Sequence, residues 1–557
     1  MAAERDRILV IGLDGVTFDL LKPWVDAGKL PTFKQLMEHG VSGSLLSTTP
    51  PLSPLAWMSF ATGKNPGKHG IFDFTKRGRD SYDITIVNSE DVHGDMLWEI
   101  LSKNGKKVGV INVTVTYPPR EVNGFLVSGM LTPSLKSTFT FPEDLRIELK
   151  RIVGTYRFDV EEEFGEGRED IFLKDLYRVT EVREKATLYL MRRFDWDFFM
   201  VMFYGTELVQ NKFWSYMDPT HPNHDAEEFE KYGETILRYF QRIDQALSKI
   251  LQNTDEKTTV VIMSDHGHGP LHKVLYVNRW LMELGLLAFK RNLLVQVKKW
   301  LGRHNLPMRI YHVLEKFGLG RIRTAVSLRR QIDIVNAFLS FRDVDWSRTK
   351  AYSHGHIGRI FLNLKGREPN GIVEPGEEYN EVRNYIISEL CELTDPETGE
   401  KVVDQVFTKE EIYAGPEVAE APDIVFLMKE MKYIAEYGSF GFHSDSLFGQ
   451  PILKDSGTHK PEGILIVSGV NVNRGKTLSD SRILDVAPTI LYMMRIPVPS
   501  DMDGKVLTGI FHEGYLNSHP VEYAEEEILE RKAKPLDWSQ KEKEQIKERL
   551  KRLGYLG

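Results

Sequence analysis

Three side chains able to bind a divalent metal follow two short apolar segments of the sequence. Asp14 follows the segment Ile8–Leu13, and Asp265 and His266 follow the segment Thr259–Met263. If both segments are strands of one open α/β sheet, their carboxyl ends meet at the crevice where such sheets bind ligands. Two carboxylates and an imidazole are a suitable ligand set for a divalent metal. Each motif alone is more typical of a turn, so this prediction depends on their convergence.

A serine at the start of a predicted helix is the candidate nucleophile. Ser53 precedes Pro54, a pattern that places Ser53 at the N-cap and Pro54 at the first helical position. A hydroxyl at that position lies in the positive field of the helix dipole, which favours a lowered pKa and the binding of phosphate. Most such serines only cap a helix. Ser53 is therefore a nucleophile only if it also meets the metal.

The elements that must position these residues have the pattern of an α/β fold. Apolar segments alternate with helical patterns, and several segments are apolar on both faces, as is typical of buried parallel strands. Residues Pro31–Gly40 predict a helix whose apolar face contains Phe33, Leu36 and Met37. The alternation predicts a mostly parallel sheet. The predicted strands are Ile8–Leu13, Val108–Val113, Phe198–Tyr204, Thr259–Met263 and Gly463–Val467.

Length, composition and charge narrow the class of protein. A chain of 557 residues fits one large domain with insertions or two to four domains. The formal net charge of −8 argues against general nucleic-acid binding. The single cysteine, Cys391, excludes an internal disulfide and a cysteine-based zinc site, and it favours a reducing compartment. No secretory signal and no run of about 18 apolar residues is visible. We therefore expect a cytoplasmic protein.

One segment differs in charge from the rest of the chain. Lys290–Arg330 contains eleven Lys or Arg residues and one acid, with apolar residues at helical spacing. This pattern predicts a basic helical insertion whose apolar face packs on the core. The alternative is binding to an anionic membrane surface or an acidic partner. The Glu- and Lys-rich C-terminus predicts a solvated helical tail. The predicted parts are a core in 1–288 and 342–515, whose second part carries a smaller insertion from Asn363 to about Ser439, a cap in 289–341 and a tail in 516–557.

Ordered motifs along most of the chain resemble the alkaline phosphatase superfamily. The resemblance is nearest to its phosphodiesterase/nucleotide-pyrophosphatase branch and the related predicted phosphohydrolase/phosphomutase group. It implies an α/β/α sandwich with a mostly parallel central sheet and an inserted helical cap. The motifs are Gly12–Gly15, Ser53 before Ala61–Gly63, Pro66–Gly70, Ser264–Gly267 and Gly457–Gly463, and Asp485–Thr489 resembles the last core helix of the superfamily.

The resemblance implies a site for two divalent metal ions. At the first, Ser53 Oγ would be the metal-activated nucleophile. Zinc is the metal that the resemblance favours, with manganese or magnesium as alternatives. The implied ligands of the first ion are Asp14, Ser53, Asp265 and His266, and those of the second are Glu207, Asn211 and His459.

Two residues of the second set depart from the pattern of the superfamily. An Asp-x-x-x-His motif is expected after a strand, and the matching residues here are Glu207 and Asn211. Glu207 keeps the carboxylate but adds a methylene group. Asn211 offers a neutral amide oxygen, which suits hard ions better than zinc. The second site would then prefer magnesium, manganese or calcium, or would bind metal weakly. Impaired or lost hydrolysis is the alternative to an active hydrolase.

The function implied is metal-dependent hydrolysis of a small phosphate ester through a phosphoserine, with a diester favoured over a monoester. The alternatives are a phosphomonoesterase or phosphomutase, and a hydrolytically weakened protein that binds metal, phosphate or a membrane surface. A sulfatase is disfavoured because Ser53–Trp57 lacks the Cys/Ser-x-Pro-x-Arg motif. The sequence does not indicate the oligomeric state. For the remaining histidines we favour hydrogen-bonded structural roles over contacts with substrate: His69, His268, His272, His354 and His356.

Overall fold

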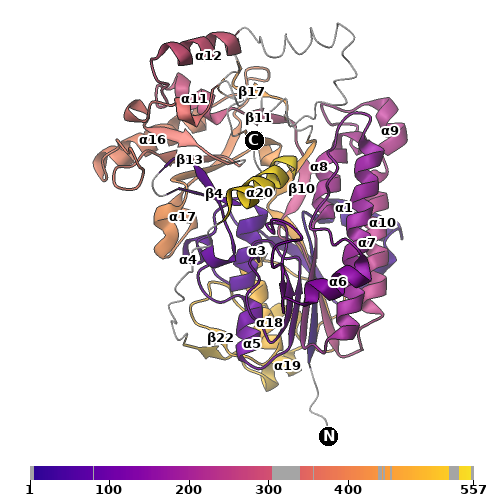
Figure 1. Ribbon diagram of the computed structural model, residues 1–557. Helices are drawn as coiled ribbons and strands as arrows, with labels where there is room; N and C mark the ends of the chain where they lie inside the picture. Colours follow the sequence, from indigo (N-terminus) through magenta and orange to yellow (C-terminus); the bar gives the residue numbers. More distant parts are fainter. Residues whose placement is uncertain are drawn as a thin grey trace.

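A ten-stranded sheet forms the centre of the computed structural model (Figure 1). The structure describes residues 6–78, 81–303, 339–355, 357–436, 442, 444, 446–451, 455–525 and 538–553. Strand β21 (Ser481–Arg482) pairs with β2 outside the main order of the sheet. That order is β20 (Lys476–Thr477), β2 (Val41–Leu46), β19 (Glu462–Ser468), β9 (Thr258–Met263), β1 (Arg7–Leu13), β8 (Phe198–Phe203), β5 (Val108–Ile111), β6 (Gly124–Val127) and β7 (Thr140–Phe141).

The central strands β9, β1, β8, β5 and β6 are parallel to one another, which confirms the predicted α/β fold with a mostly parallel sheet. All the predicted strands form, with ends that differ from the prediction by at most two residues. Strand β19 is antiparallel to both β9 and β2, and β7 is antiparallel to β6. An apolar run therefore predicts a buried strand but not its direction.

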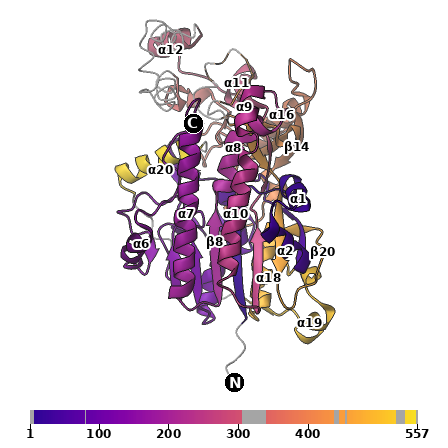
Figure 2. The same ribbon diagram turned by 90° about the vertical axis from the view of Figure 1, so that its right-hand side faces the viewer.

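Helices cover both faces of this sheet and complete the predicted sandwich (Figures 1 and 2). On one face lie α7 (Glu169–Arg193), α8 (Gly205–Met217) and α10 (Thr235–Leu251), and on the other α3 (Ser53–Thr62), α5 (Leu97–Lys103) and α18 (Val486–Met493). Helix α2 (Pro31–His39) confirms the predicted helix. Phe33 and Leu36 are buried in it, because the apolar face packs against the sheet.

A second, smaller hydrophobic core lies beyond the carboxyl ends of the central strands. A seven-stranded mixed sheet and the helices α11 (Val277–Glu283) and α16 (Glu377–Glu392) form it. Of the predicted cap 289–341, residues 304–338 lie outside the described residues, and α12 (Leu293–Arg303) is its described helix. The strands are β11 (Lys273–Leu275), β12 (Ala351–Ser353), β13 (Arg359–Leu362), β14 (Val403–Thr408), β15 (Ile424–Met428), β16 (Tyr433–Ala435) and β17 (Phe448–Gly449).

The C-terminal helix α20 (Gln540–Leu553) forms as predicted but is not simply solvated. Ile546 and Leu550 are buried against the main core, and the Arg549 guanidinium donates a hydrogen bond of 2.5 Å to the carbonyl of Met130. The apolar stripe at i and i+4 explains this docking. Within the described parts of the chain, no helix is both long and apolar enough to cross a lipid bilayer.

Strand β1 lies between β8 and β9 and brings three chain segments together. Leu13 pairs with Phe203 of β8, and Gly12 pairs with Met263 of β9. Because the strands are parallel, the residues that follow them meet at one edge. Helix α3 approaches this edge closely, since a Cβ atom on Gly12 would lie 2.6 Å from Cη2 of the buried Trp57.

This close approach predicts that Gly12→Ala destabilises the protein. The added methyl group would force the buried Trp57 ring to shift, so we expect the free energy of unfolding to fall by about 1–3 kcal/mol. The control is Gly514→Ala in α19 (Glu513–Ser518), where no heavy atom lies within 4 Å of the added Cβ. The measurement is the midpoint of urea unfolding, and equal midpoints for Gly12→Ala and wild type would contradict the close packing.

Candidate metal-binding active site

Ser53 lies at the first position of α3, at the carboxyl edge of the sheet. The N-cap is Leu52 and Pro54 is the second helical residue, so the prediction that Ser53 caps the helix is wrong by one position. Proline is tolerated throughout the first turn, where backbone N–H groups lack intrahelical partners, and it does not fix the first residue. Among the described residues, the Ser53 hydroxyl contacts the side chains of Asp14 and His266. It is therefore available to the groups in front of it.

The first predicted ligand set converges around the Ser53 hydroxyl. Ser53 Oγ donates to Asp14 Oδ1 over 3.4 Å and lies 3.2 Å from His266 Nε2. His266 Nε2 also lies 3.4 Å from Asp14 Oδ1 and 3.4 Å from Asp265 Oδ2. All four side chains are fully buried. Asp14, Asp265 and His266 can thus offer ligand atoms to one ion.

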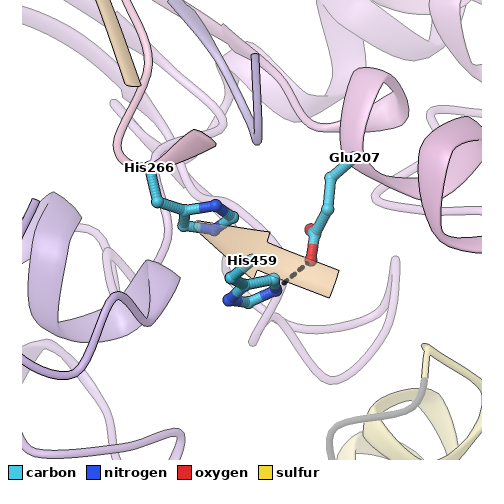
Figure 3. A group of neighbouring side chains, drawn as sticks. All are labelled: Glu207, His266 and His459. Atoms are coloured by element: carbon cyan, nitrogen blue, oxygen red, sulfur yellow. Dashed lines mark hydrogen bonds and ion pairs between the residues drawn. The ribbon is translucent and has the colours of Figure 1, made fainter. Parts of the chain in front are cut away.

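The second set meets on the other side of His266 (Figure 3). His459 Nε2 lies 2.8 Å from Glu207 Oε1. The rings of His459 and His266 stack with centroids 3.9 Å apart. Glu207 belongs to the first turn of α8, and His459 belongs to β18 (Gly457–Lys460), which pairs with β10 (Gly267–Pro270). Glu207, His266 and His459 form a second group of ligand atoms.

Both imidazoles are held in the orientation that metal ligation needs. His266 Nδ1 lies 2.9 Å from the carbonyl oxygen of Gly267, and His459 Nδ1 lies 2.8 Å from that of Pro51. A carbonyl accepts only from an N–H, so each Nδ1 carries the proton. Each Nε2 then faces the carboxylates. That of His459 donates to Glu207 Oε1 in this structure and would give up this proton to bind a metal ion, as in metal sites where the other ring nitrogen is bonded to a carbonyl.

Asn211 lies one turn along α8 from Glu207. Its Nδ2 donates to Glu207 Oε1 over 3.4 Å. The amide therefore meets the carboxylate as a hydrogen-bond donor, and the structure brings this predicted ligand to the site.

Burial dominates the electrostatics of these groups. It raises the pKa of Asp14 well above the ordinary value, and the charges of Asp265 and Glu207 raise it further. Burial and Glu207 raise the pKa of Asp265 to about 7. Burial, followed by the neighbouring His459, lowers the pKa of His266 to about 3. Burial alone would lower the pKa of His459, but the hydrogen bond and charge of Glu207 raise it above the ordinary value.

These properties fit divalent cations. Asp14, Asp265 and Glu207 are fully buried close to one another, and burying such charges without compensation is costly. Asp14 Oδ2 and Asp265 Oδ2 have no hydrogen-bond partner among the described residues. Carboxylate oxygens and neutral imidazole nitrogens are ligands that zinc and manganese accept.

The other predicted histidines divide into structural and unexplained ones. His69 is buried, with Nε2 2.9 Å from Ser59 Oγ, and Nδ1 accepts from the N–H of Ile71 over 3.2 Å. His354 Nε2 lies 3.4 Å from Thr75 Oγ1, while His356 lies outside the described residues. The expected hydrogen-bonded role of His268 is wrong, because neither ring nitrogen has a hydrogen-bond partner in the described structure.

Two further residues of α8 support the site and were not predicted. The Thr206 hydroxyl donates to the carbonyl of Asp14 over 2.6 Å, and Gln210 Nε2 donates to that of Gly15 over 2.8 Å. These bonds tie the helix that carries Glu207 to the loop that carries Asp14. Their spacing of four residues was visible in the sequence, but their acceptors are distant backbone atoms.

Solved structures share this architecture. Phosphonoacetate hydrolase from Sinorhizobium meliloti 1021 in complex with phosphonoacetate is 16% identical with a TM-score of 0.51, and its complex with phosphonoformate is 15% identical with the same TM-score. Each alignment covers 88% of this chain and 95% of that chain. Human ectonucleotide pyrophosphatase/phosphodiesterase 5 is 11% identical over 90% of this chain and 98% of its own, with a TM-score of 0.48. At these identities the first two show the fold alone.

The family match rests on the sequence. No curated protein sequence matches the chain. The family model of the type I phosphodiesterase/nucleotide pyrophosphatase matches residues 8–445, a span that includes every predicted site residue except His459. The chain therefore belongs to the type I phosphodiesterase/nucleotide pyrophosphatase family, whose members are phosphoester hydrolases of the alkaline phosphatase superfamily.

Proposed function

We propose that the chain hydrolyses a small phosphoric ester, a diester in preference to a monoester, with Ser53 as nucleophile at a site for two divalent ions. The observation that carries this proposal is the position of Ser53 Oγ, 3.4 Å from Asp14 Oδ1 and 3.2 Å from His266 Nε2. The hydroxyl starts a helix without capping it. Membership of a metal-dependent hydrolase family supports the same chemistry.

Asp14, Ser53, Asp265 and His266 would hold one ion, and Glu207 and His459, with Asn211 beside them, the other. When bound, divalent ions would supply Lewis-acid activation of the hydroxyl and charge neutralisation at the phosphoryl oxygens. His266, whose ring stacks on that of His459, offers a ligand atom to both groups. Zinc fits the first donor set, and manganese or magnesium are the alternatives.

The residues of the chain orient the reaction. Asp14 accepts the Ser53 hydroxyl proton in a hydrogen bond and so holds Oγ toward the site. Ser53 Oγ attacks phosphorus, the new O–P bond forms as the bond to the ester oxygen breaks, and that oxygen leaves with a proton. Water then hydrolyses the phosphoserine and restores the hydroxyl. A phosphomonoesterase or a phosphomutase would use the same first step.

Ser53→Ala tests the nucleophile. We expect turnover of an aryl phosphodiester to fall by at least about 1,000-fold, because an alanine offers no oxygen for the covalent step. The measurement compares an aryl diester and an aryl monoester in zinc, manganese or magnesium, with Ser53→Thr as a matched variant that keeps a hydroxyl. Full turnover by Ser53→Ala would exclude this mechanism.

Metal dependence has a stability signature as well. Asp14→Asn removes one of three mutually repelling buried carboxylates, so in chelator it should melt at or above the wild-type temperature. Zinc should raise the melting temperature of the wild type. At a free zinc concentration of 100 times the dissociation constant, binding adds about 2.7 kcal/mol to the free energy of unfolding. Zinc should raise the melting temperature of Asp14→Asn much less. A melting temperature of the wild type that is insensitive to zinc, manganese and magnesium would count against the proposal.

A second candidate function is favoured by α12. Val295 is buried in the smaller core, but Leu293 is 82% exposed, and Leu294 and Val297 are exposed beside it. The exposed Lys290 and Arg291 precede the helix. This surface, residues Lys290, Arg291, Leu293, Leu294 and Val297, suits an anionic lipid surface, where apolar side chains insert and cations meet the headgroups.

Sedimentation with phosphatidylserine-containing vesicles tests this surface. We expect the wild-type protein to sediment at moderate salt, and Leu293→Gln combined with Leu294→Gln to reduce the bound fraction several-fold. Vesicles of phosphatidylcholine alone are the control for charge. Equal sedimentation of both proteins, or none with either lipid, would contradict a membrane role for α12.

A further inference from the structure

Three consecutive residues of the smaller core have a left-handed backbone conformation. Lys429, Glu430 and Met431 lie in the loop between β15 and β16, with φ of +47°, +53° and +68°. Among the described residues, no other non-glycine residues with positive φ are consecutive. L-amino acids adopt this region at a cost, and hairpin turns that need it usually have Gly, Asn or Asp there. The sequence of the loop thus opposes its backbone conformation, which is typical of residues held in place for a function.

Hydrogen bonds to β14 and the residues before it hold this loop. The N–H of Lys429 donates to the carbonyl of Val402 over 3.1 Å, and the N–H of Glu430 donates to Asp404 Oδ2 over 2.6 Å. Lys429 Nζ also lies 2.6 Å from Glu400 Oε2. The Glu430 side chain is 81% exposed. The strained backbone therefore does not serve the side chain of Glu430.

Met431 is the buried side chain of the loop, with an exposed fraction of 2%. It belongs to a small apolar cluster that is separate from the two larger cores. The other buried members of this cluster are Leu52, Leu55, Ile357 and Leu427. Leu52 is the N-cap of α3 and Leu55 is its third residue, so they lie on either side of Ser53 and Pro54. The left-handed loop thus places Met431 in the cluster that packs on the first turn of α3.

The segment before Ser53 also reaches the second ligand group. The carbonyl oxygen of Pro51 lies 2.8 Å from His459 Nδ1. Strand β18, which carries His459, lies beside the loop of Met431. Because Pro51, Leu52 and Ser53 are consecutive, the packing of Leu52 in the cluster affects both the Ser53 hydroxyl and the carbonyl that orients His459.

We propose that Met431 is a positioning residue for the nucleophile. The left-handed loop holds Met431 against the first turn of α3, and this packing keeps Ser53 Oγ within reach of Asp14 and His266. The inference rests on the proposed function and names the part of the smaller core that sets the position of its nucleophile. Such positioning matters because a misplacement of the reacting groups by about 1 Å can cost about 100-fold in rate.

Met431→Ala tests the side chain. We expect kcat for an aryl phosphodiester to fall by at least about tenfold while KM changes less than about threefold, because the hydroxyl is displaced and the groups that bind substrate are not. Met431→Leu keeps most of the apolar volume and should restore kcat to within about threefold of the wild type. The matched control is Leu390→Ala. Leu390 is fully buried in α16, so this variant should lower the melting temperature and leave kcat unchanged.

Two substitutions of Glu430 test the backbone, since its side chain is exposed and lies outside the cluster. Glu430→Val places a β-branched residue at a φ of +53°, which such residues avoid, and should lower kcat by at least about tenfold. Glu430→Gly is the matched variant, because glycine adopts this conformation freely. It should keep kcat within about threefold of the wild type, and its melting temperature should not fall.

The outcomes separate this inference from the function on which it rests. Wild-type kcat in Met431→Ala, together with an inactive Ser53→Ala, would overturn the role of Met431 and leave the proposed nucleophile intact. Equal kcat values for Glu430→Val and Glu430→Gly would also overturn it, even if Met431→Ala does not fold. A wild-type protein without Ser53-dependent turnover would overturn the proposed function, and this inference with it.

Discussion

Repulsion among three buried carboxylates is the constraint on which the site depends. Asp14, Glu207 and Asp265 are fully buried at one edge of the sheet. After burial itself, Asp265 and Glu207 raise the pKa of Asp14, and Glu207 raises that of Asp265. The adjacent imidazoles do not neutralise them, since burial, with His459 beside it, lowers the pKa of His266 to about 3. His459 meets the charge of Glu207 directly and also lowers the pKa of Asp265. Protons taken up at these raised pKa values, or a bound cation, would compensate the remaining carboxylate charge.

Backbone connections oppose that repulsion. Thr206 and Gln210 of α8 donate to the carbonyls of Asp14 and Gly15, so the helix that carries one carboxylate is bonded to the loop that carries another. The N–H of Gly15 donates to Asp265 Oδ1 over 3.3 Å and connects the third. Each bond uses a backbone group that would otherwise lie buried and unpaired. The geometry of the ligands is thereby preorganised.

The sequence predicted what depends on local pattern. Apolar runs predicted the central strands, and the ordered motifs predicted Asp14, Ser53 and Glu207, which the structure brings to one edge of the sheet. The smaller sheet was missed, since strands such as Ala351–Ser353 are too short to show a period. The isolation of His268 could not be predicted either. Whether a buried ring has a hydrogen-bond partner depends on residues far apart in the sequence. Nothing in the spacing of residues 264–268 distinguishes His268 from a structural histidine.

The smaller core is coupled to the nucleophile through apolar contacts. Leu52 and Leu55, on either side of Ser53 and Pro54, are buried in one cluster with Ile357 and Leu427. Tyr413 adds a hydrogen bond of 2.8 Å from its hydroxyl to the carbonyl of Thr49. The smaller core therefore forms part of the wall beside the Ser53 hydroxyl, the proposed nucleophile. Because the proposed ligands lie at the edge of the central sheet, in α8 and in β18, substitutions in the smaller core can alter the choice of ester without replacing a proposed ligand.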